Sequence, residues 1–229
     1  MSAGGAAGAA GAAAVAGAGA GSGSAAAQHY VGLVRGINVG GNNRITMADF
    51  RAVFESLGYT DVATLLQSGN VVFASDRPLG LADVAAIERA FEAAAGFRAG
   101  FVVLSAPQFL AILDANPLLA IGTDLSRLVI TFLPQPPTAA PAPASLAAAT
   151  VSGPAAAAQS ATSVELPDPG PILPEVFAAG PQAVYSWHPD GISNSRVPAS
   201  FWRQLGPVYT ARNVNTADKL AALLRARAV

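Results

Sequence analysis

The amino-acid sequence predicts an α+β fold of two similar units, each built around an antiparallel sheet. Short apolar runs alternate along the chain with segments whose apolar residues recur every three or four positions, as strands and helices require. Over residues 29–105 the order is strand, helix, two strands, helix, strand, and a similar order follows after residue 121. This is the split βαβ, or ferredoxin-like, pattern, in which four antiparallel strands carry both helices on one face.

The first strand and helix have clear limits in the sequence. "YVGLVRGIN", residues 30–38, is an apolar run ending in glycine and asparagine, which predicts a buried strand. Thr46 and Asp49 form a capping-box-like start for the following helix, and Gly58 is placed as its C-cap. The apolar face of this helix consists of Met47, Phe50, Val53, Phe54 and Leu57.

A hairpin, a second helix and a fourth strand complete the first unit. "VATLLQ" and "NVVFAS", residues 62–67 and 70–75, predict two strands joined by a tight turn at Ser68-Gly69. A helix closed by Gly96 then precedes the strand "FVVLS", residues 101–105. The residues that define this helix are Leu81, Val84, Ile87, Glu88 and Phe91.

The second unit is predicted from weaker but similar signals. A helix through Phe109 to Leu113 leads into it, and "RLVITFL" is its first strand. "EVFAA" and "AVYSW" predict a hairpin, and "PVYTAR" a short last strand. Two further helices are expected at Pro198 to Leu205 and Ala217 to Ala228.

The domain boundaries follow from composition. We expect a disordered Ala/Gly-rich tail at 1–28, ferredoxin-like domains at 29–120 and 121–229, and an Ala/Pro-rich insertion at 134–174. The insertion is expected to be loop apart from one helix near 142–150. The tail has too few large apolar side chains to offset chain entropy, and it lacks the features of a signal peptide or a spanning helix. A cytoplasmic protein without a membrane partner is therefore expected.

Charge and cysteine content narrow the function. Thirteen basic residues stand against fourteen acidic ones, so no field of the whole chain attracts nucleic acid. There is no cysteine, which excludes disulfides and thiolate metal sites, and two histidines make a His-rich zinc site improbable. No metal is expected.

The glycine-rich loop after the first strand is the first candidate site. Gly36 and Gly41 have the spacing of the P-loop glycines, but asparagines stand where Lys and Ser or Thr should follow. A glycine turn before a helix can instead bind an anion, and no acid lies between His29 and Ala48. A plain turn explains the same residues. The candidates are Arg35, Gly36, Asn38, Gly40, Gly41, Asn42 and Asn43.

Three more segments offer polar side chains. At the hairpin tip, Gln67, Ser68 and Asn70 are candidates, although a tight turn explains them adequately. Ser195 and Arg196 follow "WHPDGISN", and equally suit a helix N-cap. Before the last helix stand Arg212, Asn213, Asn215 and Thr216, where Asn215 with Asp218 predicts a cap and Arg212 a carboxylate partner. If the two units face each other, these segments line one cleft.

Longer motifs resemble a known family. "RGINVGGNNRITMADFRAVFESLGYTDVATLLQSGNVVF", "HPDGISNSR" and "YTARNVNTADKL" are similar to the domain-of-unknown-function 1697 family, from about Tyr30 to about Leu224. The resemblance implies two ferredoxin-like units, as the pattern does, and it implies no activity.

Four functions are compatible with these candidate residues. Arginine, amides and backbone N–H groups favour a binding protein for a phosphate-bearing small molecule or nucleotide. A structural or protein-interaction module is the next alternative, followed by an enzyme acting on a phosphate or acyl group through Ser68 or Ser195. The candidate segments lack paired carboxylates and a histidine–nucleophile arrangement, so the sequence decides neither catalysis nor a cofactor. Nucleic-acid binding ranks last, because the aromatic string of the RNA-recognition sheet is absent. The oligomeric state stays open.

Overall fold

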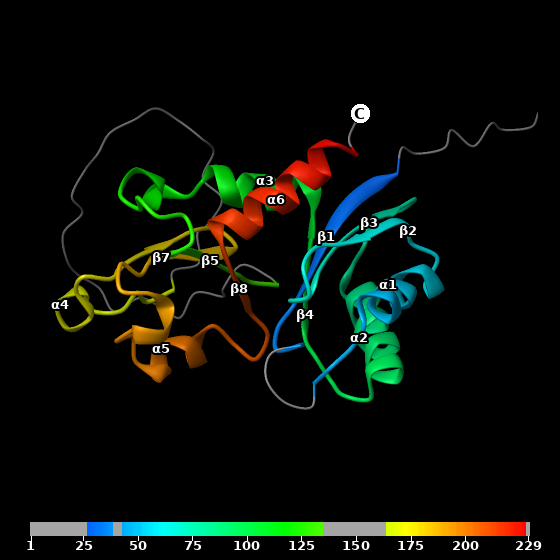
Figure 1. Ribbon diagram of the computed structural model, residues 1–229, viewed down its shortest axis with the longest axis horizontal. Coiled ribbons are helices and arrows are strands. Elements are labelled where there is room, and N and C mark those ends of the chain that lie inside the picture. The colour runs from blue at the N-terminus through cyan, green and yellow to red at the C-terminus, as the bar shows by residue number, and fades with distance from the viewer. Residues whose placement is uncertain (1–26, 39–42, 135–163, 228–229) are drawn as a thin grey trace, which may run out of the picture.

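The computed structural model describes residues 27–38, 43–134 and 164–227. The predicted tail as far as residue 26, the predicted helix at 142–150 and the candidate residues Gly40, Gly41 and Asn42 lie outside the described residues. The described chain is of mixed α+β type, with two four-stranded antiparallel sheets and helices packed on them (Figure 1). None of its helices is long and apolar enough to cross a membrane.

The first sheet has the predicted order of elements. Its strands lie in the order β2-β3-β1-β4 with every pair antiparallel, and α1 and α2 cover one face (Figure 1). Aromatic side chains from that face and from both helices form its core, with Phe50, Phe54, Phe91 and Phe101 within 6.2 Å of a neighbouring ring. The elements are β1 (Gln28–Val34), α1 (Met47–Ser56), β2 (Thr60–Thr64), β3 (Asn70–Ser75), α2 (Leu81–Ala95) and β4 (Phe101–Ser105).

Local signals explain where the first two helices begin and end. The backbone N–H of Asp49 donates to Thr46 Oγ1 at 3.0 Å, so the predicted cap of α1 is confirmed. The C-cap of α1 is Leu57 rather than the predicted Gly58, which follows one residue later with φ of +83°. Gly96 is the C-cap of α2 with φ of +78°, and glycine adopts both conformations without strain.

The predicted tight turn between β2 and β3 is wrong. β2 ends at Thr64, and five residues, 65–69, connect it to β3. Two interactions close this longer loop: Leu65 N donates to Asn70 O at 3.0 Å, and Asn70 Nδ2 donates to Leu65 O at 2.9 Å. The loop lies at the end of the sheet, where Leu66 is 51% exposed, so the two leucines that suggested a longer strand do not continue it.

The second sheet repeats the strand order of the first. Its order is β6-β7-β5-β8, again antiparallel throughout. A short helix, α4, occupies part of the predicted loop at 134–174, and the last helix begins three residues before its predicted start. The elements after β4 are α3 (Ala106–Asp114), η1 (Pro117–Ala120), β5 (Leu128–Phe132), α4 (Pro169–Ile172), β6 (Val176–Ala179), β7 (Ala183–Trp187), η2 (Ile192–Asn194), α5 (Ala199–Gln204), β8 (Thr210–Asn213) and α6 (Val214–Arg225).

The largest core lies between the two sheets. Apolar residues of β1 and β4 share one buried cluster with residues of β5 and β7 and with the inner faces of α3 and α6. Figure 1 shows α3 and α6 crossing between the sheets on one side of the molecule. This packing brings β8 against the end of β1 and the 65–69 loop, and so positions the cavity described next.

Candidate functional site

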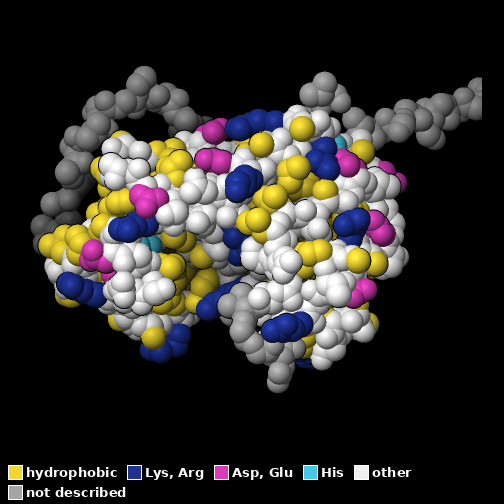
Figure 2. Space-filling model, viewed as in Figure 1, with side chains coloured by type: hydrophobic (Ala, Val, Ile, Leu, Met, Phe, Trp, Pro, Cys, Tyr) yellow, Lys and Arg dark blue, Asp and Glu magenta, His cyan; other side chains and the backbone are white. Residues whose placement is uncertain are grey.

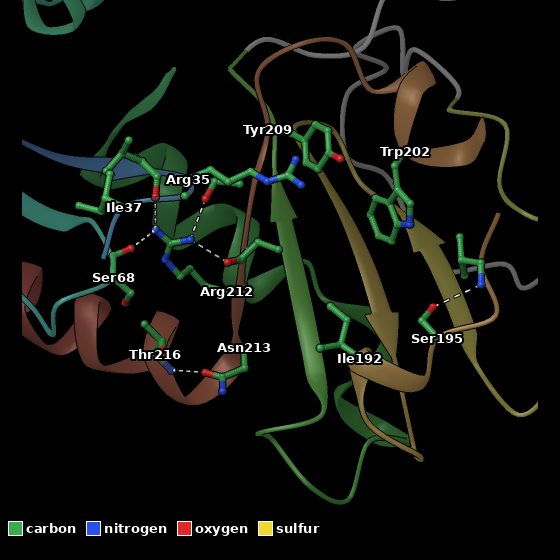
Figure 3. A pocket seen from close by; sticks show the side chains of 15 residues that line it. Arg35, Ile37, Ser68, Ile192, Ser195, Trp202, Tyr209, Arg212, Asn213 and Thr216 are labelled. Carbon is green, nitrogen blue, oxygen red and sulfur yellow. Dashed lines mark hydrogen bonds between the residues drawn. The ribbon is translucent and has the colours of Figure 1, made fainter. Parts of the chain in front are cut away.

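A cavity of about 600 Å³ lies where the two sheets meet (Figure 3). Its volume falls within the range of about 300–1,000 Å³ that is usual for small-molecule sites. One wall comes from the end of β1, the residues after it and the hairpin tip, and the other from β8, the start of α6, and the segment from η2 to Tyr209 that contains α5. The lining residues are Val34, Arg35, Gly36, Ile37, Ser68, Ile192, Ser195, Val197, Trp202, Tyr209, Thr210, Ala211, Arg212, Asn213 and Thr216.

The cavity is lined by two arginines and by no carboxylate. All fourteen acidic residues of the chain fall within the described ranges, and none of them lines it. Figure 2 shows the hollow between the two halves of the molecule, with Lys and Arg side chains near its mouth. A site with positive charge and no acidic lining attracts anions.

Arg212 joins the two sheets. From β8 its guanidinium donates Nε to Asn70 Oδ1 at 2.5 Å, and Nη2 to the carbonyls of Val34 and Ser68 at 2.8 and 2.9 Å. Nη1 donates to Thr210 Oγ1 and to the carbonyl of Ala211, both at 2.7 Å. The predicted carboxylate partner of Arg212 is wrong, because carbonyl and amide oxygens of the sheet ends take its place.

Burial lowers the pKa of Arg212 to about 10. The guanidinium is therefore still protonated at neutral pH. It places a positive charge in the cavity wall without a formal negative charge beside it. Its N–H donors already bind oxygen atoms of the protein. Arg212 can therefore attract an anion by its positive charge, but it has no free donor to offer.

Arg35 has the opposite character. It is exposed, and its guanidinium carbon lies 4.6 Å from the centre of the Tyr209 ring, a cation–π contact. Among the described residues it makes no hydrogen bond and no ion pair. Figure 3 shows Arg35 reaching across the cavity to Tyr209. All five N–H donors of this arginine are open to a ligand.

An aromatic wall faces the arginines. Trp202 is stacked on Tyr209, with ring centres 6.1 Å apart and planes inclined by 20°. Phe201 and Phe177 contact Trp202 edge-on at 4.9 and 6.2 Å. Three neighbouring rings thus hold the indole in place. No local pattern indicated this wall, because Trp202 lies on a predicted helix and Tyr209 on a predicted strand.

Ser195 belongs to a buried network behind the cavity. Its hydroxyl donates to Glu175 Oε2 at 2.7 Å, and Arg196 N donates to Glu175 Oε1 at 2.6 Å. His188 Nδ1 lies 2.6 Å from the same carboxylate. Burial acts to raise the pKa of Glu175, but these hydrogen bonds outweigh it and lower the pKa below its ordinary value. Glu175 therefore anchors the segment that carries Ser195.

The same network contains a histidine–nucleophile arrangement, which sequence reasoning had not expected. His188 Nε2 lies 2.9 Å from Ser186 Oγ, on the side opposite Glu175. Ser186 is 0% exposed, His188 1% and Glu175 5%. No substrate reaches a serine buried to this degree, so the three residues stabilise the fold of the second sheet. Only the pairing of β6 with β7 brings Glu175 to His188, which is why no local motif revealed it.

Comparison with known proteins assigns the family. Residues 27–160 match the family model described as "Protein of unknown function (DUF1697)", which is more than half of the chain. The chain belongs to the DUF1697 family. The resemblance found in the sequence motifs is thereby confirmed.

One solved structure resembles this DUF1697 protein over most of its length. It is described as "The structure of conserved bacterial protein SP0830 from Streptococcus pneumoniae", and it is 26% identical with a TM-score of 0.59. The match covers 87% of this chain and 99% of that one. Its description states no activity. A comparison with curated proteins gives no match.

The cavity of this DUF1697 protein gathers seven of the sixteen candidate residues. They are Arg35, Gly36, Ser68, Ser195, Arg212, Asn213 and Thr216. Asn70 lies directly behind, bound to Arg212 and fully buried.

Five candidates that the structure describes lie elsewhere. Asn38 and Gln67 line a separate hollow beside α1, and Asn38 uses its amide on the carbonyls of Ile45 and Gln67. Asn43 and Asn215 are exposed and line no part of the cavity. Arg196 donates Nη1 to the carbonyl of Leu173 at 3.1 Å, which turns it away from the site.

The predicted cap of the last helix is also wrong. Asn213, not Asn215, is the N-cap of α6, and its Oδ1 accepts from Thr216 N at 3.0 Å. Asn213 pairs with Val129 at the end of β8, so the strand passes directly into the helix. Ser195 is likewise not the N-cap of α5, because Pro198 holds that position without a side-chain bond.

Proposed function

We propose that this protein binds a phosphate-bearing small molecule or nucleotide in the cavity between its two sheets. The observation that carries the proposal is Arg35. Its guanidinium lines a cavity without any carboxylate, and among the described residues it makes neither a hydrogen bond nor an ion pair. A planar fork of five free donors matches the oxygens of a phosphate group.

The surroundings of Arg35 support the same ligand. Arg212 holds a second positive charge in the wall at neutral pH. Its donors are satisfied by the protein, so it favours an anion in the cavity without competing with Arg35 for the hydrogen bonds to that anion. Ser68, Asn213 and Thr216 add polar groups along the same wall. Such a site has a few polar groups on a largely preformed surface, as small-molecule sites usually do.

Binding fits the cavity better than catalysis does. The Ser195 hydroxyl lines the cavity and donates a hydrogen bond to the carboxylate of Glu175, as a catalytic serine would need. However, Glu175 accepts three hydrogen bonds and has a lowered pKa, which makes it a weak general base. Ser68 Oγ accepts from Asn70 Nδ2 at 3.1 Å, and no base among the described residues bonds to it.

A thermal-melt screen tests the proposal. The full-length protein is melted with inorganic phosphate, sugar phosphates and nucleotides, each over a concentration series. A ligand at 100 times its dissociation constant stabilises the fold by about 2.7 kcal/mol. For a chain of this size we expect the melting temperature to rise by about 5–10 °C.

Two matched variants locate the effect. Arg35→Ala should unfold within about 1 kcal/mol of the parent, because it loses only an exposed cation–π contact with Tyr209, and should lose the shift with ligand. Arg51→Ala removes an equally charged, exposed arginine on α1 outside the cavity and should keep the shift. If every phosphate ligand leaves the melt unchanged, or if Arg35→Ala keeps the full shift, the proposed function is wrong.

A further inference from the structure

We infer that the ligand of this cavity carries a planar aromatic ring as well as its phosphate, so that the site takes a nucleotide rather than a sugar phosphate or free phosphate. The inference rests on the proposed function and adds the class of ligand. It comes from the wall opposite the arginines, which the phosphate argument does not use.

The first argument is the fixed orientation of Trp202. The indole is stacked on Tyr209 and is held edge-on by Phe201 and Phe177. It remains part of the cavity lining and is only partly buried. An aromatic surface held in this way binds a planar ring without losing much conformational freedom.

The second argument is the apolar rim. Ile192 lines the cavity and is 49% exposed, and Val197, which also lines it, packs in one apolar cluster with Trp202. Figure 3 shows Ile192 and Trp202 on the side away from Ser68 and Arg212. The cavity therefore has one charged, polar side and one apolar, aromatic side. A ligand that satisfies both sides has an anionic end and a ring.

The third argument is size. A phosphate group contacts only the donors around Arg35 and would leave most of the 600 Å³ cavity to water. A sugar phosphate fills more of it but offers hydroxyls to the apolar wall. A planar ring can stack on Trp202 and cover Ile192, which neither a phosphate group nor a sugar can do as well.

Matched ligands separate the two parts of the claim. Adenosine 5′-monophosphate and ribose 5-phosphate share phosphate and sugar and differ in the base. Titration calorimetry of the full-length protein should give an affinity about 5- to 150-fold higher for the nucleotide, the usual contribution of one stacked base. Trp202→Leu should remove that preference and leave the affinity for ribose 5-phosphate unchanged. Arg35→Ala should weaken both ligands.

A fluorescence experiment needs no change at Trp202. The chain has two tryptophans, so a Trp187→Phe variant reports on Trp202 alone. We expect adenosine 5′-monophosphate to quench its emission with the calorimetric dissociation constant, and ribose 5-phosphate to leave it unchanged. Quenching that survives Arg51→Ala and is lost in Arg35→Ala would support the inference.

The failures are distinguishable. Equal affinities for the two ligands, both lost in Arg35→Ala, would refute the inference that the ligand carries a ring. The proposed phosphate site would then still be supported. Nucleotide binding without any quenching would also overturn the contact with Trp202. If neither ligand binds, the proposed function and the inference both fail.

Discussion

Replacing Arg212 by methionine tests how the two sheets are held together. Methionine keeps an unbranched stem of similar length and removes all five donors. Asn70 Oδ1 and the carbonyls of Val34 and Ser68, which belong to the first sheet and its hairpin loop, then lose the guanidinium as their donor. The contact between the sheets loses its polar bonds, while its apolar core stays intact.

The expected loss can be worked out from these contacts. The carbonyl of Ser68 is exposed and can bond to water instead. A buried polar group left without a partner costs about 1–3 kcal/mol, and three lose theirs, namely Asn70 Oδ1, the carbonyl of Val34 and the hydroxyl of Thr210, so the cost is about 3–9 kcal/mol. Against this, the substitution removes the penalty of burying the charge. A pKa lowered from the ordinary arginine value to about 10 corresponds to a penalty of about 3 kcal/mol. Subtracting this penalty leaves a loss of about 0–6 kcal/mol. We expect a net destabilisation of about 3 kcal/mol, the middle of that range.

Urea unfolding at pH 7 measures this value directly, and a thermal melt should show a fall of about 6–12 °C. Arg51→Met is the control, because its exposed side chain should change stability by no more than about 0.5 kcal/mol. If Arg212→Met stays within about 0.5 kcal/mol of the parent protein, with unchanged circular dichroism, the assigned role of Arg212 is refuted.

Two further predictions concern the second sheet. Asn213→Ala should lower the free energy of unfolding by about 1 kcal/mol, because α6 loses its N-cap. Asn215→Ala, on the exposed face, should lower it far less. Equal effects in urea unfolding would contradict the assignment of the cap. Stability should fall as pH decreases below 6.5, because burial lowers the pKa of His188, so that the unfolded chain takes up the proton first. The contribution of Glu175, whose pKa is also lowered, is fully present above 4.5 and is lost as pH falls further. Urea unfolding between pH 7.5 and 4 measures both slopes, and His188→Gln should flatten the upper one; an unchanged slope would mean that another group titrates there.

The sequence predicted the first sheet well because its signals are local. The cap at Thr46, the glycines after α1 and α2, and the apolar spacing of both helices act within a few residues of each other. The same holds for most strands of the second sheet. Errors arose where two local solutions fitted equally well. Asn213 and Asn215 both satisfy the rule for an N-cap, and the pairing of Asn213 with Val129 in the sheet decides between them.

The candidate site depended on contacts between residues far apart in the chain. Sequence alone indicated basic, amide-rich segments around Arg35 and Arg212. It predicted that they line one cleft only on the condition that the two units face each other. Only the tertiary structure separated the roles of the two arginines, since the bonds from Arg212 to Asn70 and Val34 span more than 140 residues. It also placed Trp202 beside Tyr209 in the wall opposite. Composition and periodicity fix which elements form, but the chemistry of the cavity is set by which element ends meet, and that is decided by packing across the sheets.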